Sequence, residues 1–173
     1  MKISLSTINF CGEPKNYAVI DKYLSRSAQP QKEDLSWLKE QGVTDIINFR
    51  TMYAPDIDFD EKAEVEKLGM KYHNIPSITR YPKEENVDRF LKQVETVGQN
   101  GGKVHIHCKA GADRTGMYSY IYKSLKGLGG TGVGARIANQ IEMIRMGHNM
   151  EIYPDLLPWT NKLVNKLLGK LGK

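Results

Sequence analysis

The sequence predicts an α/β protein with a central, mostly parallel sheet of four to five strands and helices on its faces. Short β-branched segments alternate with longer amphipathic segments along the chain. Residues 43–50 (VTDIINFR) are apolar almost throughout, as expected of a strand that is covered on both faces. Glycine or proline follows most of the predicted elements, which marks where each one ends.

The first half of the chain contains predicted strands and helices in alternation. In order, they are a bent strand or short hairpin over 17–28, a helix after Pro30 that ends at Gly42, a strand over 43–50, a surface helix over 58–68 and a strand over 70–75. The second half continues the alternation and then becomes helical. Its elements are a helix whose apolar face runs from Val87 to Val97, a strand over 103–108, and helices over 114–126, 135–146 and 155–168.

At 173 residues, with 40% hydrophobic and 26% charged residues, the chain is long enough for one well-buried core. We therefore expect a single domain over 1–173. No uncharged apolar run approaches the roughly twenty residues of a membrane span, and residues 1–14 lack the apolar block of a secretory signal. The two cysteines, Cys11 and Cys108, do not form a disulfide framework. A soluble protein in the reducing cytoplasm is expected.

The formal net charge of +5 favours anionic ligands. The chain has neither paired Cys/His finger spacing nor an aromatic RNA-binding signature, so no nucleic-acid partner is expected. A zinc site in HIHC is geometrically poor, because on a strand His105 and His107 face one way and Cys108 the other. The glycine pattern at 127–132 follows a helix rather than a strand, which favours a linker over a dinucleotide site. We expect no metal or other cofactor.

Residues 105–116 (HIHCKAGADRTG) join a predicted strand to a predicted helix, where an α/β sheet binds its ligands. The backbone amides from Lys109 to Arg114 can curl around a tetrahedral oxyanion. Gly111 permits this curl, and the small side chains of Ala110 and Ala112 keep the loop open. The planar guanidinium of Arg114 can hold two oxygens of the same phosphate. The spacing predicts a phosphate site.

These donors also stabilise a thiolate, so Cys108 is predicted to be an in-line nucleophile toward phosphorus that forms a cysteinyl-phosphate intermediate. Thr115 can offer its hydroxyl to the sulfur when water attacks that intermediate. His107 is expected to fix the loop from behind.

The segment 107–116, of the form H-C-x5-R-T-G, resembles the phosphate-binding loop of cysteine-dependent protein tyrosine and dual-specificity phosphatases. Upstream, YLSRSAQP, a predicted helix and VTDIINFR resemble the opening of small microbial dual-specificity-like members, so the likeness covers about two-thirds of the chain. The resemblance implies a phosphate monoester hydrolase with the fold of the dual-specificity type. It favours phosphotyrosine and related phosphoproteins as substrates.

The usual general acid of this family is an aspartate on a mobile loop before the cysteine, and residues 75–86 (IPSITRYPKEEN) contain none. Asp113 is expected to replace it, as in myotubularin-like and some bacterial lipid-active branches, which share C-x-x-G-x-D-R-T. A carboxyl beside a bound phosphate dianion is pushed toward protonation, which suits an acid. Alternatively, Asp113 only caps the helix or orients Arg114. The reserve candidates for the acid are Asp56, Asp58, Asp60, Glu84 and Glu85.

Other functions stay open. Lys109 and Asp113, with Arg50, Arg80 and Lys83 as a basic rim, permit a phosphoinositide or inositol phosphate substrate. The missing upstream aspartate permits a pseudophosphatase that binds a phosphorylated partner without hydrolysing it. Sulfur transfer or arsenate reduction would call for a shorter loop or further redox cysteines.

The C-terminal segment combines an apolar stripe with lysines and contains no acid. The stripe comprises Leu163, Val164, Leu167, Leu168 and Leu171, and the lysines are Lys162, Lys166, Lys170 and Lys173. We expect a helix that packs on the domain with a basic outer face, and contact with a membrane surface is the alternative.

Overall fold

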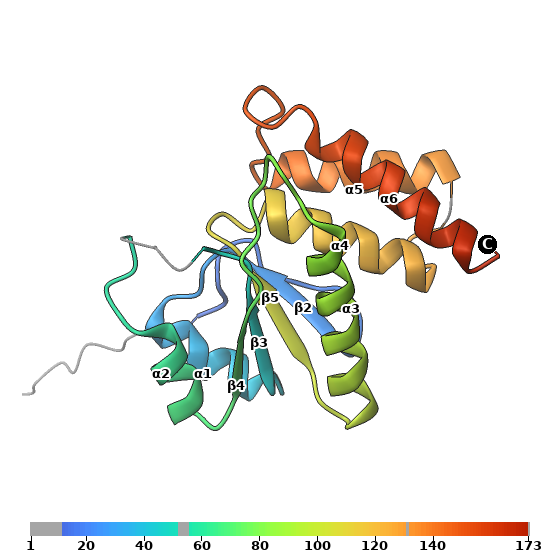
Figure 1. The fold of residues 1–173 in the computed structure, drawn as a ribbon. Helices are drawn as coiled ribbons and strands as arrows, with labels where there is room; N and C mark the ends of the chain where they lie inside the picture. Colours follow the sequence, from blue (N-terminus) through green and yellow to red (C-terminus); the bar gives the residue numbers. More distant parts are fainter. Residues whose placement is uncertain (1–11, 52–55, 131, 173) are drawn as a thin grey trace, which may run out of the picture.

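The computed structural model describes residues 12–51, 56–130 and 132–172 (Figure 1). Cys11 and Lys173, which entered the sequence analysis, lie outside the described residues.

A five-stranded sheet in the order β1-β2-β5-β3-β4 forms the centre of the structure. The strands are β1 (Ala18–Val19), β2 (Leu24–Ser27), β3 (Asp45–Asn48), β4 (Lys71–Asn74) and β5 (Val104–His107). β1 pairs antiparallel with β2, and the other pairs are parallel. The predicted mostly parallel sheet is confirmed, and residues 17–28 form the hairpin rather than one bent strand.

Six helices are present in the described part of the chain. They are α1 (Lys32–Glu40), α2 (Glu61–Lys67), α3 (Glu84–Gln99), α4 (Asp113–Lys126), α5 (Gly132–Arg145) and α6 (Leu156–Lys170). Figure 1 shows α1 and α2 on one side of the sheet and α3 to α6 on the other. Each matches a predicted helix. α2 begins later than predicted because the Asp60 side chain caps it, accepting a hydrogen bond from the backbone N–H of Ala63 (3.1 Å).

The two faces of the sheet bury separate apolar clusters. The smaller cluster, under α1 and α2, includes Leu35, Leu38 and Val65. The larger one lies under α3, α4 and α6, and Cys108 belongs to it. The apolar face predicted for α3 is the face that packs there. Cys108 therefore sits on the opposite side of the sheet from His105 and His107, whose rings stack with centroids 6.4 Å apart.

An aromatic cluster in the larger core lies at the end of β3, the strand beside β5, which leads into the loop. The rings of Phe49 and Tyr118 stack with centroids 3.9 Å apart, and Phe90 meets Tyr118 edge-on at 5.1 Å. The Tyr118 hydroxyl hydrogen bonds to Ser77 Oγ (2.7 Å), and burial raises the pKa of Tyr118 to about 12. The neutral phenol thus ties the segment after β4 to α4.

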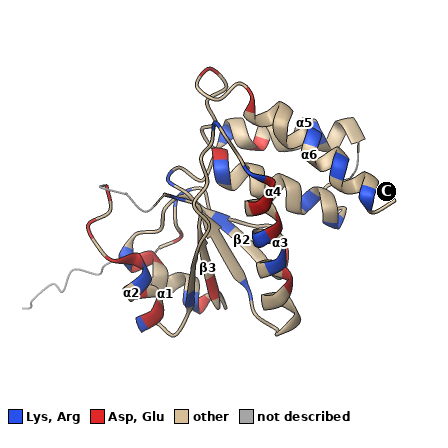
Figure 2. Cartoon of the chain, in the orientation of Figure 1, with Lys and Arg blue, Asp and Glu red and all other residues tan. Residues whose placement is uncertain are grey.

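α6 packs on α4, as the first of the two interpretations of this segment predicted. Leu163 and Val164 are buried, whereas the lysines of α6 form blue bands along its surface (Figure 2). Lys166 pairs with Glu84 at the start of α3 (2.8 Å). None of the described helices has the length and apolar character needed to cross a membrane.

Candidate active site

The loop 108–112 lies at the carboxyl end of β5, the central strand of the sheet, and leads directly into α4. Cys108 is 2% exposed and forms the floor of this region. The position follows from the topology, because parallel strands bring their carboxyl ends and the amino ends of the following helices to one edge. The loop is therefore where the sequence predicted it.

Three consecutive carbonyl groups of the loop are hydrogen bonded to groups outside it. Lys109 O accepts from the backbone N–H of Gln29 (3.0 Å), and Ala110 O accepts from Asn16 Nδ2 (2.8 Å). Gly111 O accepts from Arg26 Nη2. The N–H groups of residues 109–112 have no acceptor among the described residues. Since the carbonyls are engaged by the scaffold, these N–H groups are left free for an anion.

Gly111 is required by both its conformation and its neighbours. Its φ of 72° lies in the left-handed region. A Cβ at this position would lie 2.6 Å from Ala28 N and 2.7 Å from Ser27 O. The loop can approach the end of β2 this closely only because the residue has no side chain.

Arg26 holds the loop from β2 and is 1% exposed. Its Nη1 pairs with Glu142 of α5 (3.0 Å), while Nη2 binds Gly111 O. Burial lowers the pKa of Arg26, and the charges of Glu142 and Cys108 act in the opposite direction. A guanidinium stays protonated under these conditions, so the loop and the sulfur have a buried positive charge beside them.

Arg114 is directed toward the ends of β3 and β4. Its Nη1 donates to Phe49 O (3.2 Å) and to Ser77 O (3.5 Å). Nε and Nη2 make no hydrogen bond to any residue that the structure describes. The tether fixes one edge of the guanidinium, and two donors stay available for phosphoryl oxygens.

Thr115 is fully buried in the first turn of α4. Its hydroxyl has no hydrogen-bond partner in the described part of the chain. Buried polar groups are normally paired, so an orphan hydroxyl in the helical turn that follows the cysteine loop is a candidate for a role in the site.

Asp113 is the first residue of α4, and its carboxylate contacts His148. The pair joins Asp113 Oδ1 to His148 Nδ1. The side chain of Asp113 is 20% exposed and that of His148 is fully buried. Neither a capping hydrogen bond nor a contact with Arg114 is found for Asp113 within the described residues, so the alternative in which it only caps the helix or orients Arg114 has no support from these contacts.

The reserve acids are engaged elsewhere or lie on the surface. The hydrogen bond from Arg50 lowers the pKa of Asp56, which keeps this carboxyl ionised. Asp60 caps α2, and Glu84 pairs with Lys166. Asp58 and Glu85 are exposed.

The basic residues predicted at the rim have different environments. Arg50 is buried, donates to Gln29 Oε1 (3.1 Å) and binds Asp56. Lys109 reaches the same carboxylate at 3.5 Å. Arg80 and Lys83 are exposed. Two of these cations thus converge on one carboxylate beside the loop.

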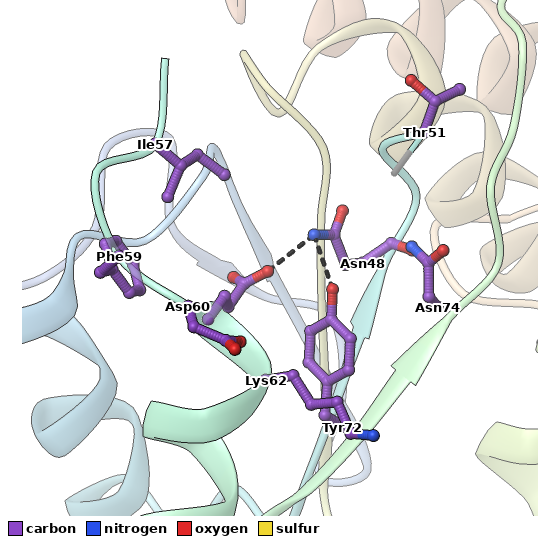
Figure 3. Close-up of a pocket in the computed structure, with 9 residues that line it drawn as sticks. Asn48, Thr51, Ile57, Phe59, Asp60, Lys62, Tyr72 and Asn74 are labelled. Carbon is purple, nitrogen blue, oxygen red and sulfur yellow. Dashed lines mark hydrogen bonds between the residues drawn. The ribbon is translucent and has the colours of Figure 1, made fainter. Parts of the chain in front are cut away.

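Behind the loop, His107 Nε2 lies 2.9 Å from Glu61 Oε1. The two atoms are close, but Nε2 makes no hydrogen bond with suitable geometry among the described atoms. Burial alone would raise the pKa of Glu61, but His107, with Gln29 and Asn48, lowers it. Asn48 also donates to Tyr72 Oη, and this network borders a pocket of about 500 Å³ between α2 and the ends of β3 and β4 (Figure 3). No residue of the loop lines that pocket.

The zinc interpretation of HIHC has no support. His105 is buried between Ser25 Oγ (3.0 Å) and Ser27 Oγ (2.8 Å), and burial lowers its pKa well below the ordinary value. Across the described ranges, no group of three or more potential metal ligands is found.

Sequence reasoning missed three residues that shape the site: Arg26, Asn16 and His148. Arg26 had a detectable signal, because a charge within a predicted strand is unusual unless it is paired. Asn16 lies 94 residues from its loop partner, and His148 follows a helix stop with no motif around it. Only the tertiary structure brings those two to the loop.

A family model described as DSP-PTPase phosphatase fused to NAD+ kinase matches residues 12–129. This span contains the sheet, the loop and α4. The chain belongs to this family. The predicted resemblance is confirmed, and this DSP-PTPase chain is a phosphatase of the dual-specificity and protein-tyrosine-phosphatase superfamily.

Solved structures similar to this DSP-PTPase chain cover more of it than the family model does. A DUF442 protein from Shewanella putrefaciens CN-32 has a TM-score of 0.73 at 25% identity, covering 88% of this chain and 91% of that one. TpbA from P. aeruginosa has a TM-score of 0.70 at 20% identity, covering 92% of both chains. The core catalytic domain of the PP-IP phosphatase SIW14 from S. cerevisiae has a TM-score of 0.64 at 16% identity, covering 92% of this chain and 94% of that one. The last two likenesses show the fold. None of the curated proteins matches the chain.

Replacing Gly111 by alanine is expected to distort the loop, because the new Cβ meets the backbone of Ser27 and Ala28. Tungstate, a tetrahedral oxyanion like phosphate, is the probe for this loop. Its affinity, measured by calorimetry, should fall by roughly 100-fold, which is the effect expected when one oriented oxyanion donor is lost. Gly127→Ala is the matched control: it also has a positive φ (69°), but nothing lies within 4 Å of its Cβ. It should lose about 1–2 kcal/mol of stability and keep its tungstate affinity. Equal affinities for the two variants would contradict this account of the loop.

Proposed function

We propose that the chain hydrolyses phosphate monoesters through a cysteinyl-phosphate intermediate on Cys108, as a protein tyrosine or dual-specificity phosphatase. The observation that carries this proposal is the outward bonding of the loop carbonyls at residues 109–111, which leaves a set of free N–H groups beside a cysteine. The donors of Arg114 and the amino end of α4 add positive potential at the same place. This arrangement favours a phosphoryl dianion and a thiolate together.

In the first step, Cys108 Sγ attacks phosphorus in line with the leaving oxygen. The S–P bond forms while the P–O bond to the leaving group breaks, and its electron pair stays on the leaving oxygen. Asp113 supplies the proton that this oxygen takes. The loop amides and Arg114 hold the three equatorial oxygens, where negative charge is spread in the transition state.

In the second step, a water molecule attacks phosphorus and the S–P bond breaks. The electron pair returns to sulfur as the thiolate leaves, and Asp113, now a carboxylate, takes a proton from the water. The buried hydroxyl of Thr115 donates to the departing sulfur. No metal or cofactor takes part in either step.

A phosphotyrosine substrate is supported by the loop that follows β4. Ser77 O contacts Arg114, and the next residue, Ile78, is 56% exposed. An apolar side chain beside a phosphate cradle suits the face of a phenyl ring. TpbA, which shares this fold, has been solved in complex with pTyr.

A phosphoinositide or inositol phosphate is the second candidate substrate. This candidate is supported by Arg50 and Lys109, which both contact the Asp56 carboxylate next to the loop. A second phosphate of the substrate would displace Asp56 and pair with the same cations. SIW14 is a PP-IP phosphatase of the same fold. Phosphate release from a panel of phosphotyrosine peptides, phosphoinositides and inositol polyphosphates separates the two classes.

Cys108→Ser is expected to reduce hydrolysis of p-nitrophenyl phosphate to the uncatalysed background, because a serine hydroxyl is not ionised at neutral pH. Tungstate binding should persist, since the loop amides and Arg114 are unchanged. Cys11→Ser, at the only other cysteine, is the matched control and should retain the wild-type rate. A wild-type protein that binds tungstate but releases no phosphate would instead be the pseudophosphatase.

Asp113→Asn is expected to slow turnover of phenyl phosphate by roughly 100-fold or more, the usual contribution of a general acid. Hydrolysis of p-nitrophenyl phosphate should fall much less, because its leaving group needs little protonation. Steady-state kcat for the two substrates measures the difference. An unchanged rate on phenyl phosphate would remove Asp113 from this role.

Thr115→Ala is expected to slow steady-state turnover more than the initial burst of p-nitrophenol. The hydroxyl is assigned to the departure of sulfur, which occurs after the phenol has left. Stopped-flow absorbance resolves the burst from the steady rate. A proportional loss in both phases would place Thr115 in the structure of the loop and not in the second step.

A further inference from the structure

A histidine that the function has not used lies against the proposed general acid. His148 Nδ1 contacts Asp113 Oδ1, and the imidazole is fully buried. His148 follows α5, whereas the region shared with the family model ends at residue 129. The contact therefore adds to the loop a side chain from outside the matched region.

The hydrogen-bonding capacities of the two side chains define their roles. A carboxylate oxygen only accepts a hydrogen bond, so His148 Nδ1–H is the donor in this contact. Nε2 of the same ring has no hydrogen-bond partner in the described ranges. Asp113 Oδ2 likewise has no partner among the described side chains. One carboxylate oxygen is thus fixed, and the other is left to carry the transferable proton.

The position of His148 is set by contacts on both sides of the pair. Its backbone N–H donates to Met143 O (2.9 Å) at the end of α5. Asn16 Nδ2 donates both to Met146 O (3.2 Å) and to Ala110 O of the loop (2.8 Å). The turn after α5 and the phosphate loop are therefore tied together through one amide as well as through the His148–Asp113 pair.

Close packing of α5 on α4 makes this contact possible. A Cβ at Gly116 would lie 2.6 Å from Met143 Cγ, so a larger residue here would displace the Met143 side chain of α5. Gly116 is the last residue of the loop motif. The residue that follows Arg114-Thr115 thus leaves room for Met143, near the end of α5.

We propose that His148 is the positioning residue of the general acid: it holds Asp113 Oδ1 by a hydrogen bond, so that Oδ2 delivers the proton to the leaving oxygen. This proposal rests on the proposed phosphatase function. A carboxyl fixed in one rotamer keeps its proton within reach of the reacting atom, and small misplacements reduce rates strongly. The imidazole makes no contact with substrate and acts only through Asp113.

The test compares His148→Leu with His148→Asn in the full chain. Leucine fills the buried space without a donor, while the asparagine amide places an N–H near the position of Nδ1. His148→Leu is expected to lower kcat for phenyl phosphate at least 10-fold and to change kcat for p-nitrophenyl phosphate less than about 3-fold, because only the former depends on the acid. His148→Asn should recover most of the loss. In an Asp113→Asn background, His148→Leu should have no further effect on phenyl phosphate.

His73→Leu is the matched control, because His73 of β4 forms a second histidine–aspartate contact within the described residues, with Asp45 of β3 (2.7 Å). It should leave the ratio of the two rates unchanged. Tungstate affinity separates positioning from support of the loop: it should be unchanged in His148→Leu. Equal losses on both substrates together with weaker tungstate binding would overturn the proposal. Failure of the phosphatase function itself would appear separately, as hydrolysis that survives Cys108→Ser.

Discussion

The carbonyl groups of residues 109–111 each accept a hydrogen bond from a different residue outside the loop, and this is the constraint on which the site depends. A peptide unit is planar, so fixing a carbonyl outward turns the N–H of the following residue inward. Three such units in succession convert a short loop into a set of convergent donors. The donors come from Gln29, Asn16 and Arg26, which all lie in the first thirty residues or so. The N-terminal segment therefore forms part of the site although none of its residues is placed in contact with substrate.

Buried charges on both faces of the sheet support this loop. On one side, Arg26 is neutralised by Glu142, which also pairs with Lys123 of α4. On the other side, Glu61 is held by His107 and by hydrogen bonds from Gln29 and Asn48. Buried ion pairs contribute little net stability, because desolvation offsets their attraction. They do restrict the backbone to one geometry, and an oriented set of amide dipoles requires that restriction.

In this family the loop before the cysteine usually carries the general acid, but the loop after β4 in this chain has no residue for that role. It supplies Ser77 O to Arg114 and an exposed apolar residue, Ile78, and it has no aspartate. Asp113, the carboxyl proposed to replace that acid, sits on the first turn of a rigid helix. A group on a helix is held more firmly than one on a loop, and its buried neighbour completes that support. In the proposed mechanism, one continuous segment then carries both the acid function and the phosphate cradle.

The sequence by itself determined the element order, the mostly parallel sheet and the place of the phosphate loop. These follow from local signals: β-branched runs, the apolar face of α3, helix stops, and a cysteine, glycine and arginine at fixed spacing. The hydrogen-bond partners of Asp113 and of the loop carbonyls were decided only by the tertiary structure. His148 and Asn16 lie far from the loop in sequence, and no periodicity or motif marks which distant side chain will meet it. Such contacts depend on how α5 packs on α4, and packing is a property of the assembled chain.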